Sequence, residues 1–279
     1  MEVRVLVENN ECGILKGEHG LALTVDHKGR KYLVDTGASG MFAENAGKMK
    51  VDLSDIDMGF LSHAHYDHSG GYPEFFAVNT KAKVYMQEAA RKKYYFKIAG
   101  FIKKYIGIPA GILDKYSDRF EYVEGYRDFG NGVHILPHTT PGLIRRAEHA
   151  HMCAMTGSKV EFDDFSHEQT VVFVEEDGLV CINSCSHGGV ENIIEEVSKV
   201  FPDRPIKAFF GGFHMMGLKG PDTCSFKKEE VQAVAEKLMN AGDTVYYSGH
   251  CTGTVAFDWL QEIMGDRIQK LHSGKTVTV

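Results

Sequence analysis

Short apolar runs rich in β-branched residues alternate with polar segments from the N-terminus onward. Runs of this kind at residues 3–7, 21–25 and 31–34 predict three strands at the start of a sheet. Residues 40–49 have helical composition, and the apolar run 58–61 predicts a further short strand. Since this run ends at a cluster of histidines, we expect the cluster at the carboxyl end of a strand.

The segment after the histidine cluster continues with a βαβ-like alternation. We expect a helix that starts at 72–76, a strand at 83–86 and a helix at 88–97. Residues 98–165 show no steady period, because glycines, a Pro-Gly pair and grouped basic and histidine residues interrupt the pattern. We interpret this region as an irregular insertion that covers the active site.

A regular pattern returns near residue 170. Two strands, 170–175 and 179–183, are joined by the tight-turn sequence Glu176-Asp177-Gly178. Further helices and strands are then predicted in alternation, at 190–201, 206–210, 227–239, 244–248 and 253–264. Because no low-complexity tract or Pro- or Ser-rich linker divides the chain, we expect one α/β domain of αββα type over residues 1–279.

Composition narrows the class of protein. Hydrophobic residues make up 43% and charged residues 25%, as in ordinary globular proteins. The net charge of -7 disfavours a nucleic-acid partner, and no apolar run is long enough to predict a membrane span. The N-terminus lacks the basic start of a signal peptide, and the six cysteines show no C-x-x-C pair. We therefore expect a cytoplasmic protein.

The densest chemistry lies in Ser62-His63-Ala64-His65-Tyr66-Asp67-His68. Alternation along an extended segment points His63 and His65 to the same side. Asp67, two residues further on, would point to the same side, and His68 follows the turn. One loop can thus offer two imidazoles to one metal ion and a carboxylate plus an imidazole to a second. The glycines at positions 70 and 71 let the chain bend sharply afterwards.

The pattern H-x-H-x-D-H resembles the signature of the metallo-β-lactamase superfamily, and Leu33-Val34-Asp35-Thr36-Gly37 resembles its first motif. The resemblance implies an αββα sandwich with a dinuclear, usually zinc, site between the edges of two sheets. It also implies that Asp35 orients the histidine loop by hydrogen bonding and is not itself a ligand. A plain turn-forming role for Asp35 is the alternative.

Two further histidines follow predicted strands, His187 in Cys185-Ser186-His187-Gly188-Gly189 and His250 in Ser248-Gly249-His250-Cys251. We predict His187 as a ligand of the first metal and His250 as a ligand of the second. The alternative for both is a structural histidine at a helix N-terminus whose side chain is satisfied by hydrogen bonds to the backbone. His138 is the other candidate for the place of His187 on the first metal.

The superfamily's bridging aspartate has no plain counterpart in this chain. Cys185 lies near the place where that aspartate would stand. It is either a ligand, a thiol beside the ligands, or a packing residue, as buried free cysteine commonly is. Without a protein bridge, water alone would link the metals.

A closer resemblance rests on motifs at residues 7–10, 63–71, 185–189, 211–214 and 249–253. Together they are similar to the dihydropterin ribofuranosyl-aminobenzene phosphate synthases of the methanopterin pathway. This resemblance favours His187 over His138. It implies loss of pyrophosphate from an activated pterin, with the aminobenzene ring as nucleophile and the metals stabilising the departing phosphate oxygens.

Other side chains are candidates for contact with substrate. We expect His214 to contact substrate or transfer a proton, unless it is a structural histidine. Tyr66 offers a phenol near the metals, and Asp67 is a candidate catalytic residue as well as a ligand. Arg145 and Arg146 are candidates for clamping an anionic substrate, with a solvated charged face as the alternative.

The predicted cofactors are two divalent metal ions, zinc first, with iron or manganese as alternatives. Such a pair activates a shared water near neutral pH. We expect an enzyme acting on a phosphorylated or pterin-like small molecule, by pyrophosphate-releasing transfer or by hydrolysis through a metal-bound hydroxide. The alternative is a generic hydrolase of esters, lactones, thioesters or phosphodiesters. A non-catalytic metal-dependent binding module is a lesser alternative.

Overall fold

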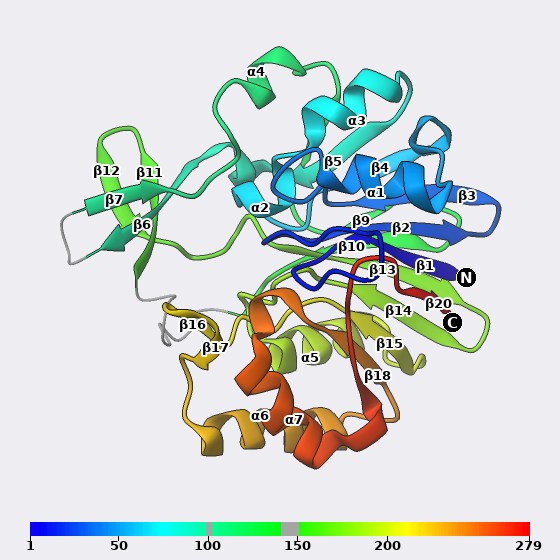
Figure 1. The fold of residues 1–279 in the computed structure, drawn as a ribbon, viewed down its shortest axis with the longest axis vertical. Coiled ribbons are helices and arrows are strands. Elements are labelled where there is room, and N and C mark those ends of the chain that lie inside the picture. The colour runs from blue at the N-terminus through cyan, green and yellow to red at the C-terminus, as the bar shows by residue number, and fades with distance from the viewer. Residues whose placement is uncertain (99–101, 141–150) are drawn as a thin grey trace.

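The computed structural model of the protein describes residues 1–98, 102–140 and 151–279. Two seven-stranded sheets form the middle of the molecule (Figure 1). Strand β20 pairs with β1, which brings the two ends of the chain together. In spatial order the strands of the first sheet are β20 (Thr276–Thr278), β1 (Glu2–Val7), β2 (Ala22–His27), β3 (Arg30–Val34), β4 (Met58–Phe60), β5 (Lys83–Gln87) and β8 (Phe120–Val123).

The second sheet comes from the later part of the chain. Its strands β14, β15, β18 and β19 are parallel neighbours, joined by the helices α5 (Val190–Val200), α6 (Lys228–Asn240) and α7 (Thr254–Met264). In spatial order the strands are β19 (Ile268–Lys270), β18 (Val245–Ser248), β15 (Ile206–Phe210), β14 (Gly178–Ile182), β13 (Gln169–Glu175), β10 (Val133–Pro137) and β9 (Arg127–Asp128).

Helices cover the outer faces of both sheets. Helices α1 (Met41–Met49) and α3 (Tyr72–Val78) lie on the first sheet, and α5, α6 and α7 lie on the second (Figure 1). In β15, Phe209 packs into the apolar cluster under these helices and Phe210 into the cluster between the sheets, because successive side chains of a strand point to opposite faces. The predicted αββα sandwich is confirmed.

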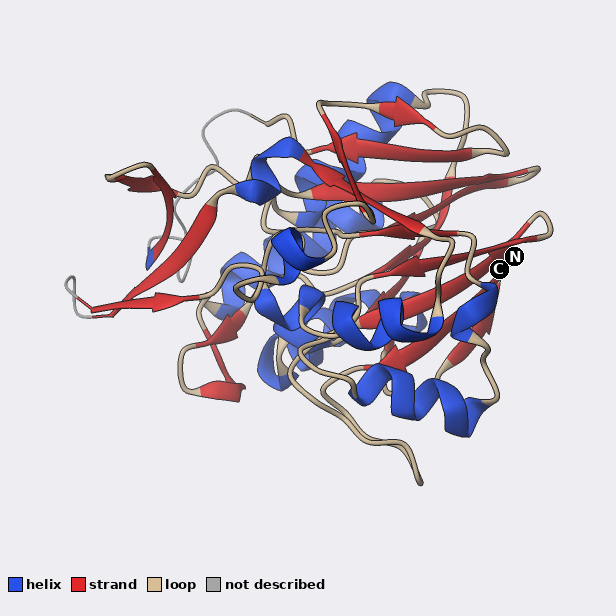
Figure 2. Cartoon of the chain, turned by 90° about the horizontal axis from the view of Figure 1, so that it is seen from above, coloured by secondary structure: helices blue, strands red, loops and turns tan. Residues whose placement is uncertain are grey.

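A four-stranded sheet projects from one end of the sandwich (Figure 1 and Figure 2). Its strands in spatial order are β12 (Lys159–Phe162), β11 (Met152–Thr156), β6 (Lys93–Ile98) and β7 (Ile102–Tyr105). The remaining short elements are the hairpin β16 (Met216–Gly217) and β17 (Gly220–Cys224), helices α2 (Tyr66–Ser69) and α4 (Ile112–Lys115), and the 3-10 helices η1 (Leu53–Asp55), η2 (Glu88–Arg91), η4 (His250–Thr252) and η5 (Gly265–Arg267).

The predicted helix at 88–97 is wrong. One turn of 3-10 helix is followed by strand β6, in which Tyr95 pairs with Cys153 of β11 and with Tyr105 of β7. Aromatic residues favour strands when partners are available on both sides, and those partners lie far away in sequence. Residues 98–165 are also less irregular than predicted, because β8 extends the first sheet and β9 and β10 extend the second.

The other predicted strands and helices are confirmed, with ends that differ by no more than two residues. Their periodic apolar faces match the three apolar clusters of the sandwich. Among the described residues, no helix is both long and apolar enough to cross a bilayer.

Candidate metal centre and pocket

The loops that carry the predicted site residues meet at one edge of the two sheets. Asp35 follows β3 and His63 follows β4, both from the first sheet. His187, His214 and His250 follow β14, β15 and β18 of the second sheet. Because these strands are parallel to their neighbours, their carboxyl ends lie on the same side, where α/β sheets place their ligands.

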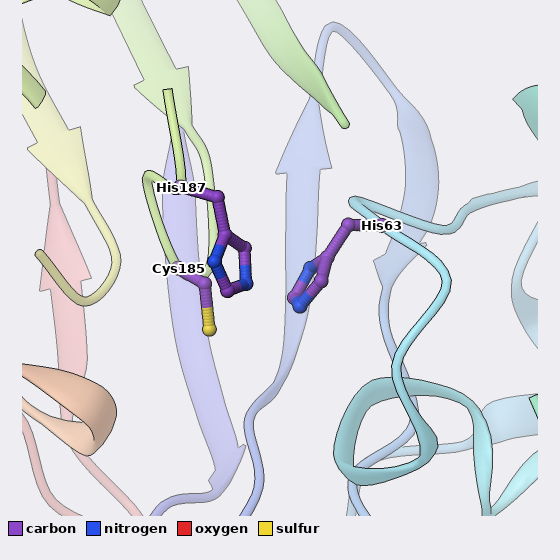
Figure 3. A group of neighbouring side chains, drawn as sticks. All are labelled: His63, Cys185 and His187. Atoms are coloured by element: carbon purple, nitrogen blue, oxygen red, sulfur yellow. The ribbon is translucent and has the colours of Figure 1, made fainter. Parts of the chain in front are cut away.

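His63, His65 and His187 form the first group of candidate ligands. Their ring centroids lie 4.7 Å apart for His63 and His65, and 4.8 Å apart for each of these rings and His187. Figure 3 shows the rings of His63 and His187 facing each other from two loops. In the described part of the chain, the buried Nε2 atoms of His63 and His65 have no hydrogen-bond partner. Buried polar atoms are normally satisfied, so a metal ion fits this place.

The second group surrounds a carboxylate oxygen of Asp67. Its Oδ2 lies 3.5 Å from Nε2 of His68, 3.4 Å from Nε2 of His250 and 3.3 Å from Nε2 of His19. The Nε2 atoms of His68 and His250 are 3.1 Å apart. One carboxylate and several imidazole nitrogens that converge in this way form a donor set that suits a divalent cation.

Hydrogen bonds on the far side of the rings fix how they point. Asp35 Oδ2 lies 2.8 Å from Nδ1 of His68, and the same carboxylate accepts hydrogen bonds from the backbone and hydroxyl of Ser62 at 2.7 and 2.6 Å. Asn9 Oδ1 lies 2.9 Å from Nδ1 of His250. With Nδ1 engaged in this way, Nε2 of each ring faces the site.

The electrostatics favour neutral imidazoles at most positions. Burial lowers the pKa of His65 and of His250 to about 3, and burial with neighbouring histidines lowers the pKa of His63 well below its usual range. His68 differs: burial lowers its pKa, but the charges of Asp67 and Asp35 outweigh that effect and raise the pKa to about 10. A cation on Nε2 of His68 would therefore take the place of a proton.

A pocket of about 270 Å³ opens over these groups. Phe96 of β6, Lys104 of β7 and Met152 of β11 line it, so the projecting sheet forms one wall. Tyr66 also lines the pocket, and its ring centroid lies 5.7 Å from the ammonium of Lys104. His214 reaches the pocket beside His187, with ring centroids 4.2 Å apart.

The remaining predicted residues lie elsewhere. His138, the rival to His187, pairs through Nδ1 with Glu196 at 3.1 Å, and its ring packs against Gly188. Burial lowers the pKa of His138, but the hydrogen bond that its ring donates to the Glu196 carboxylate outweighs burial and raises the pKa. Arg145 and Arg146 lie outside the described residues.

The comparisons with known proteins agree with this arrangement. Residues 16–145 match the family model of the metallo-beta-lactamase superfamily. Over the whole chain, the fold matches the crystal structure of Tm1679, a metal-dependent hydrolase of the beta-lactamase superfamily, with a TM-score of 0.84 and 26% identity, covering 100% of this chain and 99% of the other. The chain therefore has the metallo-beta-lactamase fold, and its residues 16–145 resemble that superfamily in sequence. This fold and the candidate His/Asp/Cys groups are typical of metal-dependent enzymes.

Two further proteins are similar to this chain. The 7,8-dihydropterin-6-methyl-4-(beta-D-ribofuranosyl)-aminobenzene-5'-phosphate synthase of Methanocaldococcus jannaschii is 23% identical over 93% of this chain and 90% of its own length. The Zn(2+)-bound PqqB of Methylobacterium extorquens shares the fold, with a TM-score of 0.58 and 11% identity over 100% of both chains.

Three polar residues of this candidate site were not predicted from the sequence. His167 accepts a hydrogen bond from the backbone of Ala64 at 3.0 Å, which steadies the loop between His63 and His65. Glu168 accepts hydrogen bonds from the backbone of His187 and of Gly188. The sequence signal that could have revealed His167 and Glu168 is the position of two ionisable residues directly before the buried strand β13.

His19 is the third residue that the sequence did not reveal. It stands alone between Glu18 and Gly20, in no motif, yet its side chain reaches Asp67 and remains 44% exposed at the pocket. Its ring centroid lies 4.9 Å from that of His250. Only the folding of the N-terminal loop onto the second group makes this residue part of the site.

Proposed function

We propose that this chain is a dinuclear-metal enzyme that acts on a phosphorylated or pterin-like small molecule. The observation that carries the proposal is the placement of two ligand groups side by side. The ring centroid of His63 lies 4.8 Å from that of His187 in its own group and 4.2 Å from that of His68 in the other. Ions held in both groups would face one pocket, and such pairs stabilise both the attacking and the leaving oxygen of a displacement.

The donor chemistry supports two divalent ions. His63, His65 and His187 would hold the first, and Asp67, His68 and His250 would hold the second. Imidazole with a single carboxylate suits zinc, and iron or manganese would be accepted by the same donors. The hydrogen bond that His68 Nδ1 donates to Asp35 is the kind of outer support that metal-binding histidines usually have.

The pocket supports a substrate with an apolar ring and an anionic group. Phe96 and Met152 supply apolar surface, and Lys104 supplies a positive charge at the same wall. The Methanocaldococcus relative is named for a product in which a dihydropterin is joined through a methyl group to an aminobenzene phosphate, and we infer a matching transfer reaction for this chain. A carbon–oxygen bond from an activated pterin to pyrophosphate would break, and a bond from that carbon to the aminobenzene nucleophile would form, with loss of the proton of the nucleophile. Bound ions would stabilise the departing pyrophosphate oxygens.

Within that reaction, the residues of this chain would bind and orient the substrate. Lys104 would attract the anionic group, and His214 and Tyr66 lie where a proton can be accepted or donated beside the pocket. Tyr66 is suited to donate a hydrogen bond as a neutral phenol, because burial raises the pKa of its hydroxyl.

A generic hydrolase is the second candidate. The same donors support hydrolysis of esters, lactones, thioesters or phosphodiesters, and Tm1679 is described as a hydrolase. A binding module without turnover would keep the metals and the pocket, so it is separated from the enzymes only by the absence of any reaction.

The test is metal content followed by an activity screen. The purified chain is loaded with zinc, dialysed and analysed for metal per chain. It is then assayed for pyrophosphate release from a dihydropterin pyrophosphate in the presence of an aminobenzene, and for hydrolysis of esters, lactones and phosphodiesters. Two ions per chain with pyrophosphate release would support the proposal. Hydrolysis alone would favour the second candidate, and fewer than two ions would refute the dinuclear enzyme.

A further inference from the structure

Cys185 lies between the two ligand groups. It follows β14 in the loop that leads to α5, and its side chain is buried. Its Sγ is 3.3 Å from Nε2 of His68. The same sulfur belongs to a cluster of ligand atoms within 4.8 Å with His63 and His187, and to another with His68 and His250. Figure 3 shows the thiol beside His187 and directed toward the space that His63 faces.

The surroundings of Cys185 differ from those of a packing cysteine. Cys181, four positions earlier and within β14, lies in the apolar cluster under the helices and illustrates the packing role. Cys185 instead lines the pocket and touches polar side chains. The thiol of Cys251 donates a hydrogen bond to the Cys185 sulfur, with the two sulfurs 3.3 Å apart. A sulfur that lies among candidate metal ligands and accepts a hydrogen bond is placed to act as a ligand itself, and a bound cation would hold it as a thiolate.

We propose that the Cys185 thiolate bridges the two metal ions, in the place where the sequence offers no bridging aspartate. This inference rests on the proposed dinuclear site and adds the ligand that joins its halves. On binding, the S–H bond breaks, the proton passes to solvent, and two metal–sulfur bonds form. The thiol of Cys251 then supports the negative charge by its hydrogen bond.

The bridge has a consequence for metal choice. A thiolate is a soft ligand, so it favours zinc over magnesium or manganese, which prefer oxygen.

X-ray absorption at the zinc edge of the fully loaded protein tests the inference. A single sulfur that bridges two ions gives about one sulfur neighbour per zinc at about 2.3 Å. A terminal cysteine on one of the two ions gives about half a sulfur per zinc at that distance. The variants are Cys185→Ser and Cys185→Asp, and the matched controls are Cys251→Ala and Cys181→Ala, with folding verified by circular dichroism.

We expect about one sulfur per zinc in the natural chain and in both controls, and none in the two Cys185 variants. Loss of a side chain that only supports a ligand lowers metal affinity by about 10- to 100-fold. Cys185→Ser removes a ligand itself, so it should weaken the binding of one zinc ion by at least this factor. Cys185→Asp should recover most of that loss, because a carboxylate can also bridge; this recovery keeps the test valid if the serine variant folds poorly.

Other outcomes would overturn the inference. Two zinc ions with half a sulfur each, or with none, would exclude the bridge while leaving the dinuclear enzyme intact. Sulfur that persists in Cys185→Ser and disappears in Cys251→Ala would assign the ligand to Cys251. Fewer than two ions in the natural chain would overturn the bridge together with the proposed function.

Discussion

Replacement of Asp35 by asparagine tests how the second ligand group is oriented. The Asp35 carboxylate accepts three buried hydrogen bonds, two from Ser62 and one from Nδ1 of His68. An asparagine side chain has one oxygen and one NH2 group, so its NH2 group must face at least one of these donors. In Asp35→Asn the His68 ring therefore loses its fixed proton position or its fixed orientation.

The magnitude follows from the bonds that are lost. A buried hydrogen bond to a charged group contributes about 1.5–3 kcal/mol to stability. Outer partners of metal-binding histidines are worth about 10- to 100-fold in metal affinity, or about 1.4–2.7 kcal/mol. We expect Asp35→Asn to weaken binding of the second ion by this factor and to leave the first, held by His63 and His65, little changed.

A matched control is available at the far end of the sandwich. His27 Nδ1 and Glu175 Oε1 are 2.7 Å apart, a histidine–carboxylate contact of nearly the same length as that of His68 and Asp35. Glu175 ends β13 at the opposite end from the metal-binding loops. Glu175→Gln should therefore lower the free energy of unfolding without changing metal affinity.

Zinc affinity in both variants is measured by competition with a chromophoric chelator, and stability by urea unfolding. The reasoning is refuted if Asp35→Asn binds both ions as tightly as the natural chain. It is refuted equally if Glu175→Gln weakens metal binding by the same factor, because a general loss of stability would then explain both effects.

Three further predictions concern the metals, the pocket and a distant ion pair. Chelation of zinc should lower the melting temperature. At a free zinc concentration 100 times the dissociation constant, an ion held by His63 and His65 stabilises the fold by about 2.7 kcal/mol, and an unchanged melting curve would contradict this. Lys104→Ala should raise KM for anionic substrates more than for neutral ones, whereas Lys97→Ala on the neighbouring strand should not. Burial raises the pKa of Glu196, but hydrogen bonds, first from His138, lower it to about 2. A lowered carboxyl pKa gives stability that is full above the usual value near 4.5 and is lost as the pH falls toward 2. The free energy of unfolding of Glu196→Gln should therefore fall less than that of the natural chain as the pH is lowered through this range, as acid unfolding would show.

The sequence by itself determined the sandwich and the central loop of candidate metal ligands. Apolar periodicity and β-branched runs are local signals, so most strands and helices were predictable, and the spacing of His63, His65, Asp67 and His68 identified their loop. Strand β6 was not predictable, because its aromatic residues form a strand only when β7 and β11 pair with both of its edges.

Only the tertiary structure decided which distant residues join this loop. His250 lies 182 positions from His68, and Cys185 lies 117 positions from it, yet the carboxyl ends of parallel strands bring all three within contact. The choice between His187 and His138 as the candidate ligand likewise depended on which ring the fold turns toward His63 and which it pairs with Glu196. His19 carried no sequence signal, because an isolated histidine takes its role from neighbours that the chain supplies only on folding.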